Sequence, residues 1–190
     1  YTDGRPAAGV LSTNGLWWRY YTTTSNLNRA RVAAIANLLL CKDYLARPVA
    51  FSGVEAVAES DTSVAIRTAP ECIACHSSID PLAATLFGFW WKPLESQAEL
   101  AVYHPEREPL GAALLEVEPA YFGVPVNSLA DVGTLIAADP RFRRCTVETM
   151  ASLYWRRPVV LTDFPTLNAI NARFGDETLK MHALIGEIME

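Results

Sequence analysis

The stretch Cys72-Ile-Ala-Cys-His76 constrains this chain more than any other part of its sequence. The spacing C-x-x-C-H is the attachment pattern of c-type haem. Residues three and four apart are neighbours on a helix surface, so Cys72, Cys75 and His76 would share one side of a helical turn. The motif therefore predicts one covalent haem c, with Cys72 and Cys75 as its attachment points and His76 as the proximal ligand of the iron.

Three other interpretations of the motif compete with haem. A redox-active dithiol usually opens a helix after a strand, but "SVAIRTAPE" before Cys72 has no strand-like run. A structural zinc site needs four ligands that usually come as two close pairs, and Cys41 and Cys145 are isolated from one another. A chance match of so short a pattern is the third. We favour haem over all three.

Composition excludes several classes of protein. The net charge is −5, which argues against nucleic acid as a partner because phosphate binding needs a basic patch. Hydrophobic residues make up 51% of the chain, which is ample for a buried core. The longest apolar run, "AAIANLLLC", is far shorter than the roughly 20 residues of a membrane span. We therefore expect no transmembrane segment in this chain.

The predicted haem also implies a compartment. Haem is joined to such motifs outside the cytoplasmic membrane, so we expect a periplasmic or extracellular protein whose export signal is absent from a chain that begins at Tyr1. Cys41 and Cys145 remain once haem takes the other pair. Leftover cysteines in an oxidising compartment often form a disulfide, which we favour over two buried free thiols.

The fold class expected from the periodicity is all-α, a small helical domain of the c-type cytochrome kind with long loops. Asp80-Pro81 and Asp139-Pro140 are typical helix-start signals, and Ser128 with Asp131 resembles a capping box. Loops are expected at residues 46–70 and 105–127. Helices are expected at residues 27–45, 82–91, 95–103, 129–138, 141–155, 163–175 and 176–189.

Two long stretches resemble a known family. "GVLSTNGLWWRYYTTTSNLNRARVAAIANLLLC" followed by "CIACHSSIDPLAATLFGF" is similar to haem-c domains of unknown function in large exported planctomycete and myxobacterial proteins. "VNSLADVGTLIAADPRFRRCTVETMASLYWRRP" is similar to the companion domain that follows them there. The chain departs from the family where Ala83, Ala84 and "FGFWWKP" stand in place of a glycine and an acidic stretch, and where Arg156-Arg157 stands in place of Gly-Arg at the end of the companion helix. The positions that match are Cys41, Cys72, Cys75, His76, Asp80, Pro81 and Cys145.

The resemblance implies two domains. Residues 1–110 would form the haem-c attachment domain, and residues 111–190 a helical companion domain packed on it. It also implies a module of a longer protein. The aromatic stretch "FGFWWKP" at residues 87–93 is one that a small domain would not bury completely, so we expect it to serve as a docking surface.

The second axial ligand of the iron has several candidates. His104 follows Val102 and Tyr103, which could turn it inward, and we predict His104 as the distal ligand. Met150 is the alternative, although its helical spacing is that of a core residue. Met181, His182 and Met189 lie on the last helix, where packing is the expected role. A five-coordinate iron, or a ligand from another chain, also remains open.

Three functions are compatible with these observations. An electron-transfer module with one covalent haem, working with a redox protein or in a larger membrane-associated or extracytoplasmic complex, is the function we favour. A peroxidase-like haem enzyme would need an open iron site with acid–base groups, and only Glu106, Arg107 and Glu108 beside His104 offer any. The third function is that of a structural subunit whose fold is stabilised by the covalent haem. No catalytic residue is predicted.

Overall fold

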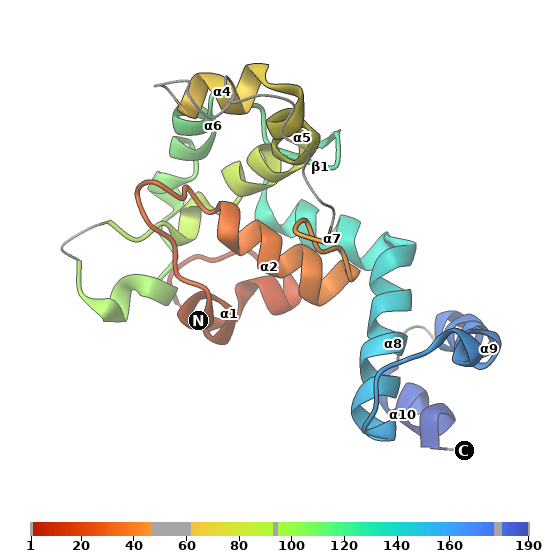
Figure 1. Cartoon of the computed structure of the whole chain (residues 1–190). Coiled ribbons are helices and arrows are strands. Elements are labelled where there is room, and N and C mark those ends of the chain that lie inside the picture. Colours follow the sequence, from red (N-terminus) through yellow and green to blue (C-terminus); the bar gives the residue numbers. More distant parts are fainter. Residues whose placement is uncertain (1, 47–61, 93–94, 177–179, 190) are drawn as a thin grey trace. The chain divides into compact units, whose positions relative to one another are not determined.

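The computed structural model describes residues 2–46, 62–92, 95–176 and 180–189 (Figure 1). Helices account for 66% of the structure and strands for 2%, which confirms the expected all-α class. The α-helices are α1 (Asn14–Arg19), α2 (Arg29–Leu40), α4 (Thr62–Thr68), α5 (Pro70–Ala84), α6 (Leu110–Leu115), α7 (Leu129–Ala138), α8 (Pro140–Trp155), α9 (Phe164–Asp176) and α10 (Met181–Met189).

Short elements connect these helices. Two strands pair antiparallel, with Ala120 opposite Pro125 and Tyr121 opposite Val124. They are β1 (Ala120–Tyr121) and β2 (Val124–Pro125), and the 3-10 helices are η1 (Gly9–Ser12), η2 (Phe87–Phe89), η3 (Gln97–Ala101), η4 (Pro105–Arg107) and η5 (Leu161–Asp163).

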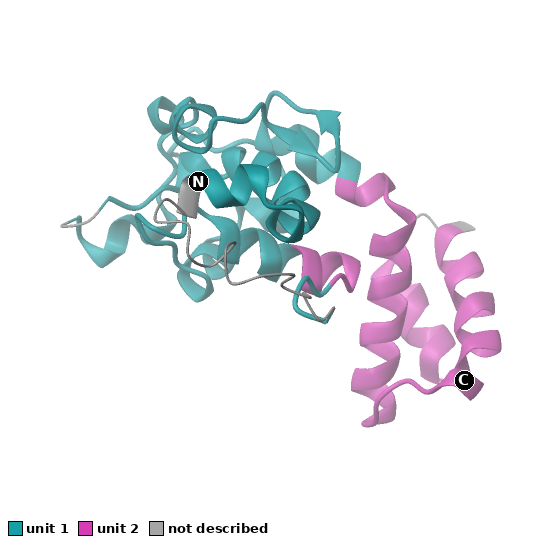
Figure 2. Ribbon diagram, turned by 45° about the horizontal axis from the view of Figure 1, so that its top comes forward, with its two compact units in different colours: residues 1–35, 43–135 teal, residues 36–42, 136–190 magenta. Residues whose placement is uncertain are grey.

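The chain divides into two compact units (Figure 2). Unit 1 consists of residues 1–35 and 43–135, and unit 2 of residues 36–42 and 136–190. The end of α2 belongs to unit 2, where Cys41 is bonded to Cys145. The boundary expected from the sequence, between residues 110 and 111, lies inside unit 1.

The core of unit 1 is built from stacked aromatic rings. Trp17 stacks on Phe89 with their ring centroids 4.2 Å apart, and Phe89 meets Tyr103 edge-on at 5.1 Å. Such pairs add about 0.5–1.5 kcal/mol beyond the area they bury. The stretch that was expected to stay partly exposed is therefore mostly internal, because Phe87, Phe89 and Trp90 are all buried.

Unit 2 is a small bundle of α8, α9 and α10, which pack against one another. Each helix contributes apolar residues at intervals of three or four, so each has one buried face. Full burial of one such side chain contributes about 1.5–3 kcal/mol. The buried members are Val147, Ala151, Leu167, Ile170, Phe174, Leu184 and Ile188.

The predicted helix starts of α7 and α8 are confirmed. The Ser128 hydroxyl accepts the Asp131 N–H at 3.2 Å, at the beginning of α7. Asp139 is the N-cap of α8, and its carboxylate accepts the Arg141 N–H at 2.9 Å. Pro140 occupies the first turn, where its missing N–H costs nothing.

The predicted helix start at Asp80-Pro81 is wrong. Helix α5 runs without interruption from Pro70 to Ala84, with Pro81 inside it. Proline fits the helical φ angle and here removes a single hydrogen-bond donor, which the surrounding packing outweighs. Asp80 is not a cap, and its carboxylate has other partners, described below.

The predicted loops contain structure that the sequence did not indicate. Helix α4 lies within residues 46–70, while residues 47–61 lie outside the described part of the chain. Helix α6 and the strand pair lie within residues 105–127. Helices α4 and α6 both pack against α5, beside which Figure 1 shows them. A Cβ atom on Gly111 would lie 2.1 Å from the Ala84 carbonyl oxygen, so α6 needs glycine there to approach α5.

Candidate functional site

Helix α5 carries the C-x-x-C-H motif in its first two turns. Ala69 is the N-cap and Pro70 opens the helix, which places Cys72 in the first turn and Cys75 and His76 in the next. Both thiols are free and partly exposed. The helical arrangement that the motif predicted is therefore present, on two cysteines that are each partly exposed.

His76 is held from one side of its ring. Its Nδ1 lies 2.9 Å from Oδ1 of Asp80, one helical turn further along α5. The His76 side chain is 24% exposed. Among the residues that the structure describes, no hydrogen-bond partner occupies its Nε2. The ring is thus anchored through Nδ1, and no side chain in the described ranges takes up Nε2.

Asp80 connects this ring to a second helix. Its side chain is only 6% exposed, and both carboxylate oxygens accept hydrogen bonds from Arg29 of α2, at 2.7 Å from Nε and 3.0 Å from Nη2. Burial by itself raises the pKa of Asp80, but the hydrogen bonds from His76 and Arg29 outweigh it and leave this pKa below its ordinary value. Asp80 is therefore a carboxylate, not a carboxylic acid.

A cavity of about 270 Å³ opens beside His76 and Asp80. Its wall is mostly apolar, which suits a flat hydrophobic ligand. A neighbouring cavity of about 260 Å³ shares Ile66, Arg67 and Asp80 with it. Each is slightly smaller than the ~300–1,000 Å³ of typical cofactor pockets. The remaining lining residues of the first cavity are Ile73, Ser77, Pro81 and Val117.

The donor set on α5 fits a covalently attached haem. Two accessible thiols and one open imidazole nitrogen are the groups that this attachment needs, and they lie within five consecutive residues. Within the described ranges, no three His, Cys, Asp or Glu side chains form a cluster that could hold a bare metal ion. A zinc site built from all four cysteines is also excluded, because Cys41 and Cys145 are bonded to each other and cannot be ligands.

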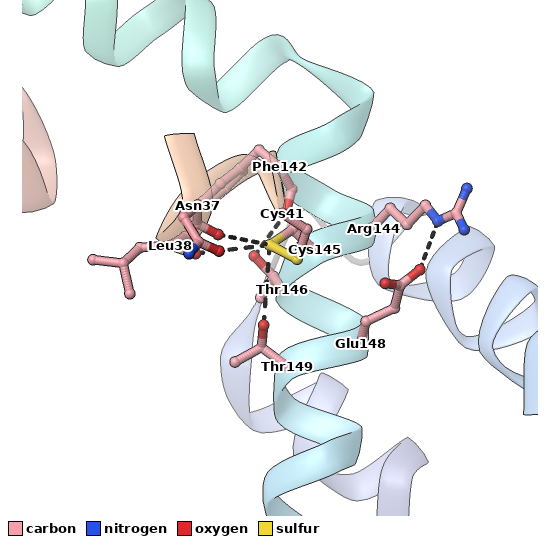
Figure 3. Close-up of a disulfide and its surroundings, with 9 residues drawn as sticks. All are labelled: Asn37, Leu38, Cys41, Phe142, Arg144, Cys145, Thr146, Glu148 and Thr149. Carbon is pink, nitrogen blue, oxygen red and sulfur yellow. Dashed lines mark hydrogen bonds and ion pairs between the residues drawn. A yellow bond between two sulfur atoms is a disulfide. The ribbon is translucent and has the colours of Figure 1, made fainter. Parts of the chain in front are cut away.

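The predicted disulfide is confirmed in unit 2 (Figure 3). Cys41 and Cys145 are bonded with their Cα atoms 5.3 Å apart. The sulfur of Cys145 also touches the carbonyl oxygens of Asn37 and Leu38, at 3.9 and 3.7 Å. A disulfide is compatible with an oxidising, exported location.

His104 lies in unit 1 between two carboxylates. Nε2 is 3.3 Å from Glu99 and Nδ1 is 3.2 Å from Glu106, distances that suit ion pairs when the ring is protonated. Nε2 is nevertheless buried without a hydrogen bond of good geometry among the described residues. No described contact joins His104 to His76, so its role as distal ligand stays a prediction.

The methionine candidates lie in unit 2, whereas His76 lies in unit 1. Met150 packs against the apolar core of α8, α9 and α10, the role that its spacing indicated. Met181, His182 and Met189 are exposed on α10, so the packing role expected for them is wrong. Leu184 and Ile188 form the buried face of that helix instead.

Two residues of the site were missed or misassigned at the level of sequence. Asp80 was interpreted as a helix cap, although its position four residues after His76 already placed both on one helix face. Arg29 had no local signal, because it is 51 positions away from Asp80.

No helix in the described part of the chain is long and apolar enough to cross a membrane. Comparison of the chain with models of protein families, with curated proteins and with solved structures found no match. The site therefore has to be interpreted from its own geometry.

Proposed function

We propose that this chain is a c-type cytochrome module that carries one covalent haem and transfers single electrons. The observation that supports it is the side-chain arrangement on α5, where free thiols at Cys72 and Cys75 precede a His76 ring that is held through Nδ1 by Asp80. The resemblance to exported haem-c domains points the same way. The proposal includes export to the periplasm or cell exterior, with which the Cys41–Cys145 disulfide is compatible.

The attachment chemistry needs nothing beyond the residues of α5 and the porphyrin. Each thiol adds across one vinyl group, so that a C–S bond forms and the thiol hydrogen passes to the other vinyl carbon. No oxidant is consumed. Haem, once bound, supplies one-electron chemistry at its iron.

The residues around the motif would support this role in distinct ways. Nε2 of His76 would bind the iron, and Asp80 would hold the ring from behind. Ile66, Ile73, Pro81 and Val117 would give the haem face an apolar surface. A redox protein, or a larger extracytoplasmic assembly to which this module belongs, would exchange the electrons.

The test is expression of the full chain with an export signal in a host that attaches haem c. Acid-acetone extraction of the denatured protein should leave all haem on the polypeptide, and its mass should rise by one haem. The single variants Cys72→Ala and Cys75→Ala should each lose one thioether bond, and the double variant should release haem completely on extraction.

The matched control is Cys41→Ala with Cys145→Ala, which removes the other two cysteines. This variant should keep its covalent haem, because the two cysteines that it removes are bonded to each other in the wild type and Cys72 and Cys75 remain. Haem that leaves the wild-type chain on extraction would contradict the thioether bonds. Haem that stays on the polypeptide after extraction of the Cys72→Ala, Cys75→Ala double variant would contradict the assignment to α5.

A further inference from the structure

We propose that Asp80 and Arg29 are positioning residues that set the tautomer and the electron-donating strength of His76. This inference rests on the proposed function, since His76 is there the ligand of the haem iron. It concerns three side chains of unit 1 that form one hydrogen-bonded chain, from Arg29 on α2 through Asp80 to His76 on α5.

The tautomer follows from the chemistry of the acceptor. An ionised carboxylate accepts hydrogen bonds and donates none, so the proton between Asp80 and His76 belongs to Nδ1. A neutral imidazole that is protonated on Nδ1 has its lone pair on Nε2. Asp80 therefore keeps open the nitrogen that faces away from it, which is the one available to a metal.

The position of Asp80 makes this hydrogen bond effective. Both partners lie on one face of α5, four residues apart, so the helix backbone fixes their separation. The carboxylate is almost completely buried, and a hydrogen bond shielded from water is stronger than an exposed one. A partner behind a metal-binding histidine orients the ring and raises its basicity.

Arg29 has the opposite effect on the electron-donating strength of His76. Its guanidinium binds both oxygens of Asp80 and withdraws electron density that would otherwise pass to the Nδ1–H. Asp80 thus strengthens His76 as an electron donor, and Arg29 moderates this effect. A stronger donor stabilises the ferric state, so the two residues should move the reduction potential in opposite directions.

The first experiment measures the reduction potential of the haem-loaded full chain. It also measures the iron–histidine stretching frequency of the reduced protein in a His104→Ala background, where the iron would be five-coordinate. Asp80→Asn weakens the acceptor, so we expect a more positive potential and a lower stretching frequency. Arg29→Gln should shift both quantities in the opposite directions. Arg29→Lys keeps the charge but loses the two-pronged contact, and it should give a smaller shift of the same sign as Arg29→Gln.

The matched control is Asp131→Asn, the same chemical change at a carboxylate that accepts the Asn127 N–H at the start of α7. It should leave both quantities unchanged. If Asp80→Asn behaves like this control, the inference is overturned. If the Asp80 and Arg29 variants shift the reduction potential in the same direction, the inference is also overturned. Such a result would indicate a loosened fold and not an electronic effect passed from Arg29 through Asp80 to His76.

The second experiment separates this inference from the proposed function. Nitrogen-15 NMR of the full chain without haem reports which ring nitrogen of His76 carries the proton. We expect Nδ1–H in the wild type and a return toward Nε2–H, the form preferred in water, in Asp80→Ala. An Nε2–H wild type would contradict the inference even in a chain that binds haem, while an Nδ1–H wild type would support it even in a chain that does not.

Discussion

Cys41 and Cys145 are 104 positions apart in the sequence, and their Cα atoms lie 5.3 Å apart in unit 2. The bond ties the segment after α2 to the middle of α8. It closes a long loop, and the stabilisation expected from loop closure grows with loop length. The bond joins segment 36–42 covalently to the rest of unit 2.

Removal of the disulfide should therefore destabilise the protein. We expect the double variant Cys41→Ala, Cys145→Ala to lose about 3–5 kcal/mol of free energy of unfolding. Urea unfolding followed by circular dichroism measures this loss. A reductant should lower the stability of the wild type and leave the double variant unchanged. An equal response of both proteins would show that the bond contributes nothing.

The backbone of Cys41 offers a finer test. Its φ angle is +48°, in the left-handed region, directly after the last residue of α2. Residues with a side chain pay roughly 1–2 kcal/mol there, and glycine does not. In a background that carries Cys145→Ala, the variant Cys41→Gly should be more stable than Cys41→Ala by about 1 kcal/mol. The reverse order in urea unfolding would contradict the left-handed conformation.

Arg31 is a buried cation at the aromatic core of unit 1. Its guanidinium donates to the carbonyl oxygens of Tyr20 and Phe89 and lies over the Trp17 ring. Burial lowers the pKa of Arg31 to about 9, which reflects the cost of taking its charge out of water.

Arg31→Ala should cost about 3 kcal/mol of unfolding free energy, because it leaves a cavity and two carbonyls without donors. Arg31→Met should cost less, since methionine fills the space and removes the buried charge. The exposed Arg19→Met is the control and should change stability by less than about 0.5 kcal/mol. If Arg31→Met is less stable than Arg31→Ala, this explanation of the role of Arg31 is wrong.

The lowered pKa of Asp163 predicts that unit 2 loses part of its stability in acid. Hydrogen bonds from Arg157 and from the Val160 backbone lower the pKa of Asp163 from 3.8 to about 2. The unfolded chain therefore binds a proton between those pH values that the folded chain does not. The contribution of Asp163 is present above pH 3.8 and is lost as the pH falls toward 2.

Asp163→Asn should accordingly flatten the decline of the urea midpoint between pH 4 and pH 2. Arg157→Gln should flatten it as well, because it removes the partner that lowers this pKa. An acid decline as steep in both variants as in the wild type would contradict the assignment.

His104 is the predicted second axial ligand, and the ferric spectrum tests it. A six-coordinate low-spin spectrum in the wild type should become high-spin in His104→Ala. An unchanged spectrum would transfer the prediction to Met150, for which Met150→Leu is the corresponding variant. A wild type that is already high-spin and reacts fast with peroxide would favour the peroxidase-like alternative over electron transfer.

Local patterns account for what the sequence predicted correctly. The helical turn of the C-x-x-C-H motif, the Ser128 and Asp139 helix starts and the helical character of α8 and α9 each depend on residues within one or two helical turns. Such residues meet whatever the rest of the chain does, because the helix itself sets their spacing. The short helices α4 and α6 had no clear periodicity, and their existence depends on packing against α5.

The sequence by itself therefore determined the all-α class, the position of both thiols and His76 on one helix, and the cysteines left to pair with each other. Only the tertiary structure decided that Asp80 binds Arg29 of α2, 51 positions away, and that Phe87, Phe89 and Trp90 are buried. The physical reason is that a carboxylate can bond equally well to a backbone N–H or to a guanidinium. Which partner it meets is set by the packing of segments that lie far apart in the chain.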